Sequence, residues 1–222
     1  MQIALLDLAE TARLGAAIAR AALSNEDLDE ALIIALSGPL GAGKTALTKA
    51  VGAALGVKEI ISSPTFTMLN EYYSGALPLF HMDLYRAGNT GEVMDLTMLA
   101  VELEESMDSP MILILEWAEF FDVGGQNFLA GRDHLKIDLE IVKQTNDPRI
   151  AKYFCNGSQK DQGGQLLREA TEIGKNFESP QKLSIKDGIA DHRIATLRPL
   201  GANAEALVAT LTAELSDILI NC

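Results

Sequence analysis

The chain has 222 residues, 48% of them hydrophobic, so it is long and apolar enough to bury a full core, which excludes an intrinsically disordered chain. Its 18 Lys and Arg against 31 Asp and Glu give a formal net charge of −13, which argues against direct nucleic-acid binding because proteins hold that polyanion mainly with basic side chains. No apolar run approaches the roughly 18 residues that a membrane-spanning helix needs.

The first elements lead into a phosphate-binding motif. Apolar residues at helical spacing predict a helix over 8–23, and after a polar break the apolar run 31–36 predicts a strand. Residues 38–45, GPLGAGKT, satisfy G-x-x-x-x-G-K-[ST], and 46–55 return to helical spacing. Strand, glycine loop and helix is the order in which this motif binds the phosphates of a nucleotide.

Each residue type in the motif has a physical reason. Glycines let the backbone curl so that successive N–H groups face an anion at a helix N-terminus. Lys44 supplies a positive charge to the outer phosphates, and Thr45 offers a hydroxyl to Mg²⁺. We therefore expect nucleotide contacts from the loop and the first helical turn, at Gly38, Gly41, Ala42, Gly43, Lys44, Thr45 and Ala46.

The following elements continue an α/β pattern. Two strand-like runs, 66–73 and 78–84, predict a hairpin, and the acidic segment 91–107 predicts a helix. The near-continuous apolar run 111–115 is typical of a central strand buried on both faces. Alternation then predicts strands at 134–142 and 193–200, and helical spacing predicts a closing helix at 203–220.

The last two predicted strands are separated by residues 143–192, about 50 residues, far beyond the usual loop length. The segment is rich in Gly, Gln, Asn, Lys and Asp, and its one helical stretch is 165–175. We interpret it as a surface insertion. The whole chain, 1–222, is then a single α/β domain of the phosphate-loop NTPase type: a mainly parallel sheet with helices on both faces and an antiparallel addition from the C-terminal strands.

Candidate residues for metal and water chemistry stand at predicted strand ends. Glu116 directly follows the run 111–115, which is the place of a Walker B acid, although a polar residue at a strand end is the simpler alternative. Asp83 is placed to orient or deprotonate a water, and Arg86 to pair with Asp83 or with a phosphate. A purely structural pair between Asp83 and Arg86 fits the local sequence nearly as well.

Three other residues allow two interpretations each. Thr65, after a serine and a proline, suits either a switch threonine for the metal or γ-phosphate, or a turn residue. Trp117 suits either stacking near the nucleotide or core packing. His81 is more typical of a packed histidine than of a catalyst, and the sequence assigns it no role.

The motifs LSGPLGAGKT, ISSPTFTMLNEY, LFHMDLYR and ILILEWAE, in this order and at these separations, resemble the TsaE family, also known as YjeE. These are P-loop ATPases of bacterial tRNA threonylcarbamoyladenosine biosynthesis. The resemblance covers roughly 6–142 and 193–215. The chain departs from the family at Pro39, where an Asp is usual, and in the insertion. Proline donates no N–H, but the first loop positions contribute least to the phosphate cradle, so binding should survive.

The resemblance implies ATP and Mg²⁺ as ligands. It implies that Lys44, Asp83 and Thr65 serve catalysis and that Thr45 and Glu116 serve the metal. It also places Trp117 beside the nucleotide, and Leu8 and Thr11 near the adenine.

The resemblance implies a function in a complex as well. Family members join TsaD- and TsaB-type proteins, which transfer a threonylcarbamoyl group to adenosine 37 of ANN-decoding tRNAs, and ATP hydrolysis resets that complex between turnovers. The chain would then meet tRNA only through its partners.

The N-terminus has no basic segment before its short apolar run, so we expect no signal peptide. The two cysteines, Cys155 and Cys222, have neither the spacing of metal ligands nor that of a disulfide framework. We therefore expect a cytoplasmic protein.

Other classes of phosphate-loop protein fit less well. A GTPase needs an Asn/Thr-Lys-x-Asp element, which is absent from the sequence. A small-molecule kinase needs an arginine-rich lid, and Arg149 and Arg168 do not have lid-like spacing. A non-hydrolysing assembly factor driven by ATP occupancy would use the same site, so the sequence leaves it open.

Overall fold

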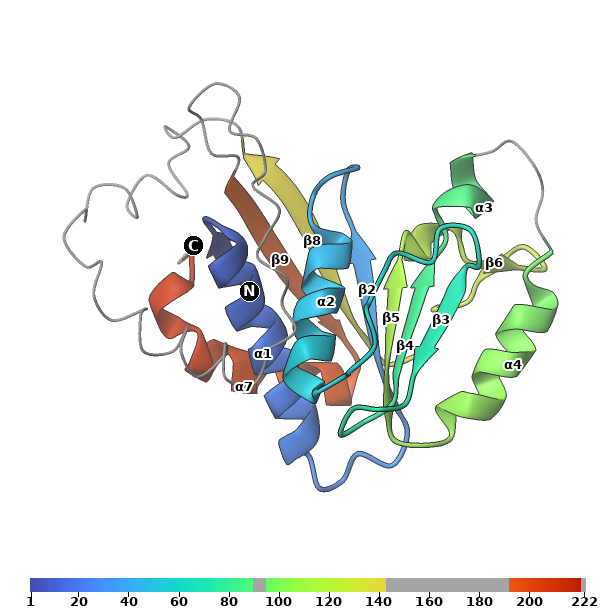
Figure 1. Cartoon of the computed structure of the whole chain (residues 1–222), viewed down its shortest axis with the longest axis horizontal. Coiled ribbons are helices and arrows are strands. Elements are labelled where there is room, and N and C mark those ends of the chain that lie inside the picture. Colours follow the sequence, from blue (N-terminus) through green and yellow to red (C-terminus); the bar gives the residue numbers. More distant parts are fainter. Residues whose placement is uncertain (90–94, 143–191, 221–222) are drawn as a thin grey trace.

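The computed structural model describes residues 1–89, 95–142 and 192–220, and within them the chain forms a seven-stranded sheet (Figure 1). The strands in spatial order are β1 (Gln2–Leu5), β9 (His192–Leu200), β8 (His134–Val142), β2 (Ala31–Ser37), β5 (Met111–Glu116), β4 (Leu79–Asp83) and β3 (Leu69–Tyr72). The central four, β8, β2, β5 and β4, are parallel, whereas β9, β1 and β3 each pair antiparallel with their inner neighbour. The predicted mainly parallel sheet with an antiparallel C-terminal addition is confirmed.

Helices cover both faces of the sheet (Figure 1). One face packs against α1 (Leu8–Ser24), α2 (Lys44–Leu55) and α7 (Ala202–Glu214). The other packs against α4 (Thr97–Met107) and the short 3₁₀ helix η1 (Ala118–Phe120). Shorter elements complete the described chain, namely α3 (Tyr85–Asn89), η2 (Ser216–Ile218) and the small hairpin of β6 (Asp122–Val123) and β7 (Gln126–Asn127).

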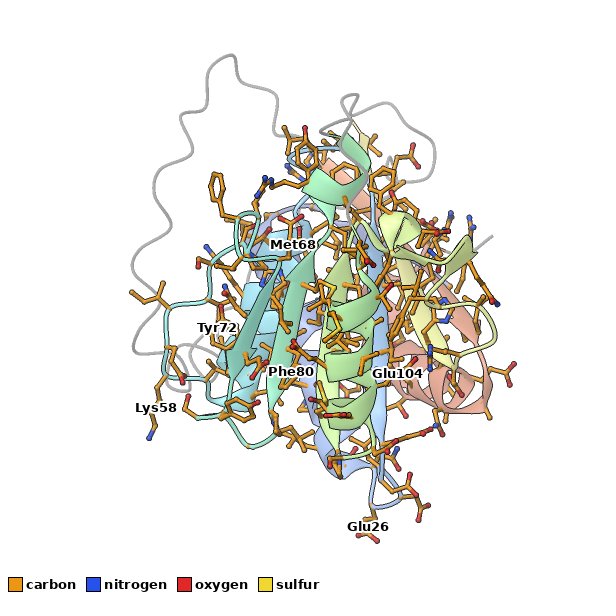
Figure 2. All side chains as sticks on the ribbon, turned by 90° about the vertical axis from the view of Figure 1, so that its right-hand side faces the viewer. Glu26, Lys58, Met68, Tyr72, Phe80 and Glu104 are labelled. Atoms are coloured by element: carbon orange, nitrogen blue, oxygen red, sulfur yellow. The ribbon has the colours of Figure 1, made fainter. Side chains whose placement is uncertain are left out.

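The strand β2 shows why the central runs are apolar throughout. Ile34 and Leu36 lie in the cluster with α1 and α2, whereas Ile33 and Ala35 lie in the cluster with α4. Successive side chains of a strand point to opposite faces, so a strand buried on both sides needs apolar residues at every position. Figure 2, seen from the α4 side, shows Phe80 of β4 beside that helix, and Phe80 belongs to the same cluster.

The observed boundaries differ from the predicted ones where turns intervene. The first hairpin strand begins only at Leu69, because Met68 has a left-handed φ of 65° and its N–H donates to the carbonyl of Pro64 at 2.6 Å, which closes a turn. Within the predicted helix 91–107, α4 begins at Thr97, and residues 90–94 lie outside the described part. The last helix ends at Glu214, and η2 follows.

The strand β1 is absent from the sequence-based prediction. It has four residues, too few for a periodic signal, and its partner β9 lies almost at the other end of the chain, with Leu5 paired to Arg193. The predicted insertion, including the helical stretch 165–175, falls almost entirely outside the described residues. None of the described helices combines the length and the hydrophobicity that crossing a membrane requires.

Candidate nucleotide site

The backbone of the loop between β2 and α2 depends on glycine. Gly38 and Gly43 have φ angles of 138° and 102°, in the left-handed half of the map that glycine adopts readily. A Cβ on Gly38 would lie 2.4 Å from the carbonyl oxygen of Leu139 on β8, so only glycine lets the loop approach this strand. Gly43 offers α2 no capping side chain, which leaves the first N–H groups of the helix available to an anion.

Lys44, the first residue of α2, lies buried at the centre of the loop. Its Nζ donates to the carbonyl oxygens of Gly38 at 2.8 Å and Pro39 at 3.1 Å. The same atom lies 3.8 Å from the centroid of the Trp117 ring. Burial lowers the pKa of the ammonium below its usual 10.5, and the nearby carboxylates, Glu116 foremost, act in the opposite direction.

Two acidic side chains meet beside the loop because their strands are parallel neighbours. Glu116 ends β5 and Asp83 ends β4, and the two residues are paired in the strand register. Alternation places both on the sheet face that α2 covers, the face that Ile114 of β5 also occupies. Both carboxylates are buried. The predicted strand-end candidates are thus brought together under the first turn of α2.

Both oxygens of the Glu116 carboxylate are in use. Oε2 accepts a hydrogen bond from the Thr45 hydroxyl at 3.2 Å. Oε1 lies 2.8 Å from Nε2 of His81, a residue of β4 that is fully buried. The carboxylate is therefore fixed from two sides, by the phosphate-loop helix and by the neighbouring strand.

Asp83 is held by the segment that contains Thr65. Its Oδ2 accepts hydrogen bonds from the hydroxyls of Ser63 at 2.6 Å and Thr65 at 2.8 Å, and its Oδ1 accepts from the N–H of Tyr85 at 3.0 Å. These partners, rather than Arg86, hold the carboxylate in the part of the chain that the structure describes. The predicted Thr65 and Asp83 do lie together, although 18 residues separate them in sequence.

Trp117 follows Glu116 and turns the chain out of β5. Its φ is 60°, a left-handed value that is uncommon for a residue with a large side chain, and its N–H donates to the carbonyl of Leu36 at 3.1 Å. The ring stacks near Phe120 at a centroid distance of 6.1 Å and lies 5.4 Å from Tyr85. The indole is thus both packed and in contact with the phosphate loop.

The residues present fit a magnesium ion. The donor atoms at this place are the Thr45 hydroxyl and a carboxylate oxygen of Glu116, and hard oxygen donors are what Mg²⁺ prefers. Across the described residues there is no group of three His, Cys, Asp or Glu side chains that could form an all-protein cage. Mg²⁺ in nucleotide enzymes usually takes one or two protein ligands and completes its shell with phosphate oxygens and water.

The residues expected near the adenine lie in the first turn of α1. Both α1 and α2 begin at the end of the sheet where strand β2 ends (Figure 1). Leu8 is 53% exposed, whereas the Thr11 hydroxyl donates to the carbonyl of Asp7 at 3.3 Å. Arg193 connects this region to the loop, since it pairs with β1 in the register and its Nη2 donates to the carbonyl of Gly41 at 3.3 Å.

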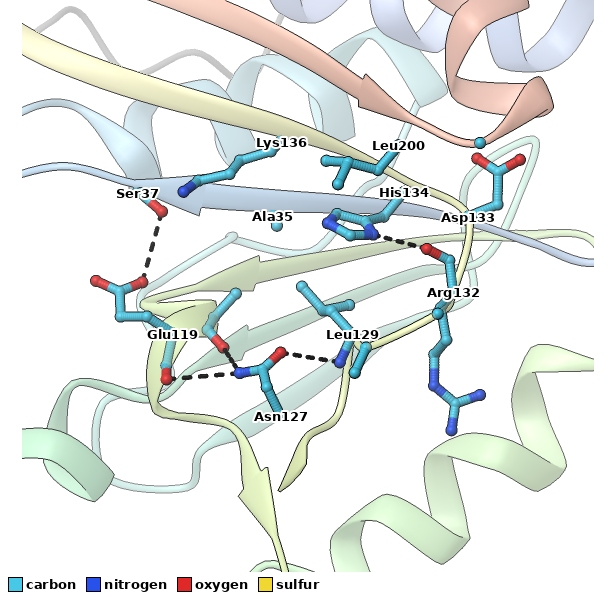
Figure 3. Close-up of a pocket in the computed structure, with 14 residues that line it drawn as sticks. Ala35, Ser37, Glu119, Asn127, Leu129, Arg132, Asp133, His134, Lys136 and Leu200 are labelled. Atoms are coloured by element: carbon cyan, nitrogen blue, oxygen red, sulfur yellow. Dashed lines mark hydrogen bonds between the residues drawn. The ribbon is translucent and has the colours of Figure 1, made fainter. Parts of the chain in front are cut away.

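A cavity of about 770 Å³ lies on the other face of the sheet (Figure 3). Its walls include Ala35 and Ser37 of β2 and Lys136 of β8, which alternate with residues that face α2. Glu119 borders it and accepts a hydrogen bond from the Ser37 hydroxyl at 3.5 Å. One of its wall residues, Ser37, directly precedes the phosphate loop in the sequence, but none of the residues expected to contact phosphate or metal lines the cavity.

The family model described as threonylcarbamoyl adenosine biosynthesis protein TsaE matches residues 5–150. The chain belongs to the TsaE family. Among curated proteins named tRNA threonylcarbamoyladenosine biosynthesis protein TsaE, that of Nostoc sp. is 44% identical over 97 residues, or 44% of this chain and 59% of the relative. That of Haemophilus influenzae is 33% identical over 137 residues, or 58% of this chain and 81% of the relative.

The TsaE protein of Bacillus subtilis is 39% identical over 90 residues, which are 40% of this chain and 52% of the relative. The chain therefore spans only about half the length of some of the TsaE relatives that it matches. The crystal structure of YdiB from Bacillus subtilis superposes with a TM-score of 0.56 at 21% identity, over 96% of this chain and 94% of that one. This likeness shows the shared phosphate-loop fold.

Three contacts in this TsaE site were not foreseen from the sequence. They are the hydrogen bonds between His81 and Glu116, between Ser63 and Asp83, and between Arg193 and the loop carbonyl of Gly41. The alternation of Leu79, His81 and Asp83 along β4 was the available signal for the first, because it places both polar residues on one face. No local pattern pointed to Arg193.

Proposed function

We propose that this chain is a Mg²⁺-dependent ATPase that supports the formation of threonylcarbamoyladenosine in tRNA. The observation that carries the proposal is the meeting of the Thr45 hydroxyl and the Glu116 carboxylate, 3.2 Å apart, at the first turn of a helix that follows a glycine-rich loop. Phosphates favour such a helix N-terminus, and a metal there needs these oxygen donors. Membership of the TsaE family supports adenine as the base.

The loop residues bind the phosphates of the nucleotide. The N–H groups of the loop and first helical turn, from Gly41 to Ala46, cradle the phosphates, and the Lys44 ammonium leaves the carbonyls of Gly38 and Pro39 to pair with them. Thr45 and Glu116 would hold Mg²⁺, which would supply positive charge against the negative charge of the phosphoryl group. The rest of the nucleotide is bordered by Trp117, Leu8 and Thr11.

Asp83 has the task of positioning the attacking water. It is a buried carboxylate at the strand end next to Glu116, and its bonds from Ser63 and Thr65 fix its orientation. When a γ-phosphate draws Thr65 towards itself, Oδ2 of Asp83 loses one of its two hydroxyl donors and becomes able to accept from water. This exchange links occupancy of the site to the conformation of the segment around Thr65.

The proposed partners are the transferase subunits, of TsaD and TsaB type, and tRNA is met only through them. The net charge of −13 opposes direct binding to a polyanion. The whole described chain serves this function as one phosphate-loop domain in the cytoplasm. An insertion at about 143–192 is supported by the pairing of Val142, the last residue of β8, with His192, the first residue of β9.

Phosphate release by the purified chain tests the proposal. With ATP and increasing Mg²⁺, the wild type should release phosphate in a metal-dependent manner, and Lys44→Met should not. The matched control is Lys49→Met, which changes an exposed lysine on the same helix and should behave as the wild type. ATP binding without any phosphate release would instead favour the assembly-factor alternative, and no ATP binding would contradict the proposal.

A further inference from the structure

Among the residues that the structure describes, the side chain of His81 on β4 has one hydrogen-bond partner, the carboxylate of Glu116. Nε2 of His81 lies 2.8 Å from Oε1 of Glu116, while Nδ1 is buried and has no partner in this part of the chain. A carboxylate only accepts hydrogen bonds, so the ring hydrogen is on Nε2. His81 is 0% exposed, so its ring has no contact with solvent, and within the described residues the bond to Glu116 is the only hydrogen bond of the ring.

Core packing alone does not explain a histidine here. A buried nitrogen without a partner carries a desolvation cost that an apolar side chain of similar size would avoid. The neighbours on this face, Leu79 of the same strand and Ile114 opposite in the register, are apolar and would accept such a side chain. The contact with Glu116 is what distinguishes His81 from a leucine.

The two hydrogen bonds to the Glu116 carboxylate come from different elements, one from the phosphate-loop helix and one from the sheet. The Thr45 hydroxyl on Oε2 is itself a candidate metal ligand, whereas His81 on Oε1 belongs to the neighbouring strand β4. A ligating carboxylate that is fixed by a second hydrogen bond keeps its free lone pairs aimed at the metal, and partners of this kind affect metal affinity by about 10- to 100-fold.

We propose that His81 is a positioning residue that orients Glu116 for Mg²⁺, a role that rests on the proposed function. In this role it acts through Glu116 and not on the nucleotide or the metal itself. Without its N–H the Glu116 carboxylate rotates away from the orientation that Thr45 and the metal share. Nucleotide binding without metal is then unaffected, and the part of the affinity that Mg²⁺ adds is lost.

Three variants separate this role from simple packing. His81→Gln places an amide N–H the same number of bonds from the backbone as Nε2 and should keep the contact with Glu116. His81→Asn places its amide at the position of Nδ1, which has no partner, and His81→Leu has no donor at all. Calorimetric ATP affinity, measured with Mg²⁺ and with a chelator, is the readout, and Mg²⁺ titration of turnover accompanies it.

We expect the half-saturating Mg²⁺ concentration to rise about 10-fold or more in His81→Leu and His81→Asn, and to stay close to the wild type in His81→Gln. Affinity for ATP in chelator should be the same in all four proteins. In a Glu116→Ala background, His81→Leu should have no further effect on the metal dependence. If His81→Leu does not fold, the comparison of the Gln and Asn variants carries the test.

Two different failures are distinguishable. If the wild type itself shows no Mg²⁺ dependence, the proposed function fails. If the wild type depends on Mg²⁺ but the Leu and Asn variants keep that dependence, or lose affinity equally with and without metal, His81 is only a packing residue. A Gln variant as impaired as Leu would also overturn the positioning role.

Discussion

The ammonium of Lys44 lies 3.8 Å from the centroid of the Trp117 indole while it donates to two carbonyls of the phosphate loop. A cation over an aromatic face is held by the ring quadrupole, an attraction of about 0.5 to 2 kcal/mol. The only tryptophan of the chain is thus in direct contact with the lysine that, under the proposed function, pairs with the phosphates.

The first prediction uses this contact as a signal. ATP should draw Lys44 away from Trp117 and so change the intrinsic tryptophan fluorescence in a saturable way. In Lys44→Met the signal should no longer respond to ATP, because the cation is absent. Fluorescence titration of both proteins is the measurement, and Lys49→Met serves as the control. A full response in Lys44→Met would show that the contact is unrelated to nucleotide binding.

The second prediction concerns pH. Burial lowers the pKa of Lys44 below 10.5, so the native state binds this proton more weakly than the unfolded chain does. The stability of the native state should therefore rise as pH increases from the native pKa towards 10.5, and this rise should be missing in Lys44→Met. Urea unfolding between pH 7 and pH 10.5 measures it. Parallel curves for the two proteins would contradict the assigned burial of the ammonium.

The third prediction separates water activation from binding. Asp83→Asn keeps the side-chain shape but is a weaker base, so turnover should fall by on the order of 10²- to 10⁴-fold while ATP affinity persists. Phosphate release and calorimetry on the same preparation measure both quantities. Glu71→Gln, which changes an exposed acid on the adjacent strand β3, is the control. Normal turnover in Asp83→Asn would make this carboxylate structural.

The fourth prediction concerns the hydroxyls on Asp83. Under the proposed function Thr65 exchanges its hydrogen bond with Asp83 for one with the γ-phosphate, so Thr65→Ala should weaken the preference of the transferase partners for the ATP-bound over the ADP-bound chain. Thr67→Ala, an exposed hydroxyl on the same segment, should leave it unchanged. Co-sedimentation with the partners in ATP and ADP measures the preference. Equal preference in wild type and Thr65→Ala would remove Thr65 from the switch.

Local sequence was sufficient to predict the parts of the site that are local in the chain. The segment from Gly38 to Thr45 determines its own loop and helix start, because glycine freedom and helix geometry act over a few residues. The same holds for the buried strand that ends at Glu116. These elements were predicted almost to their observed bounds.

Contacts between distant segments could not be predicted in the same way. The bond from His81 to Glu116 spans 35 residues and requires β4 and β5 to be neighbours, and periodicity fixes which face a side chain occupies but not the order of strands. Arg193 reaches Gly41 across 152 residues through the pairing of β9 with β1, a strand that the sequence did not reveal. Side-chain partners of this kind follow only from the assembled sheet.

The most direct test of the account is the number of threonylcarbamoyladenosines formed per transferase complex, with this chain, its partners, tRNA and excess ATP. If hydrolysis by this chain supports repeated turnover, the wild type should give many modified tRNAs per complex, whereas Asp83→Asn, which still binds ATP, should stop at about one, because a step that must repeat in each cycle is lost. Equal yields with the wild type and Asp83→Asn would contradict the account.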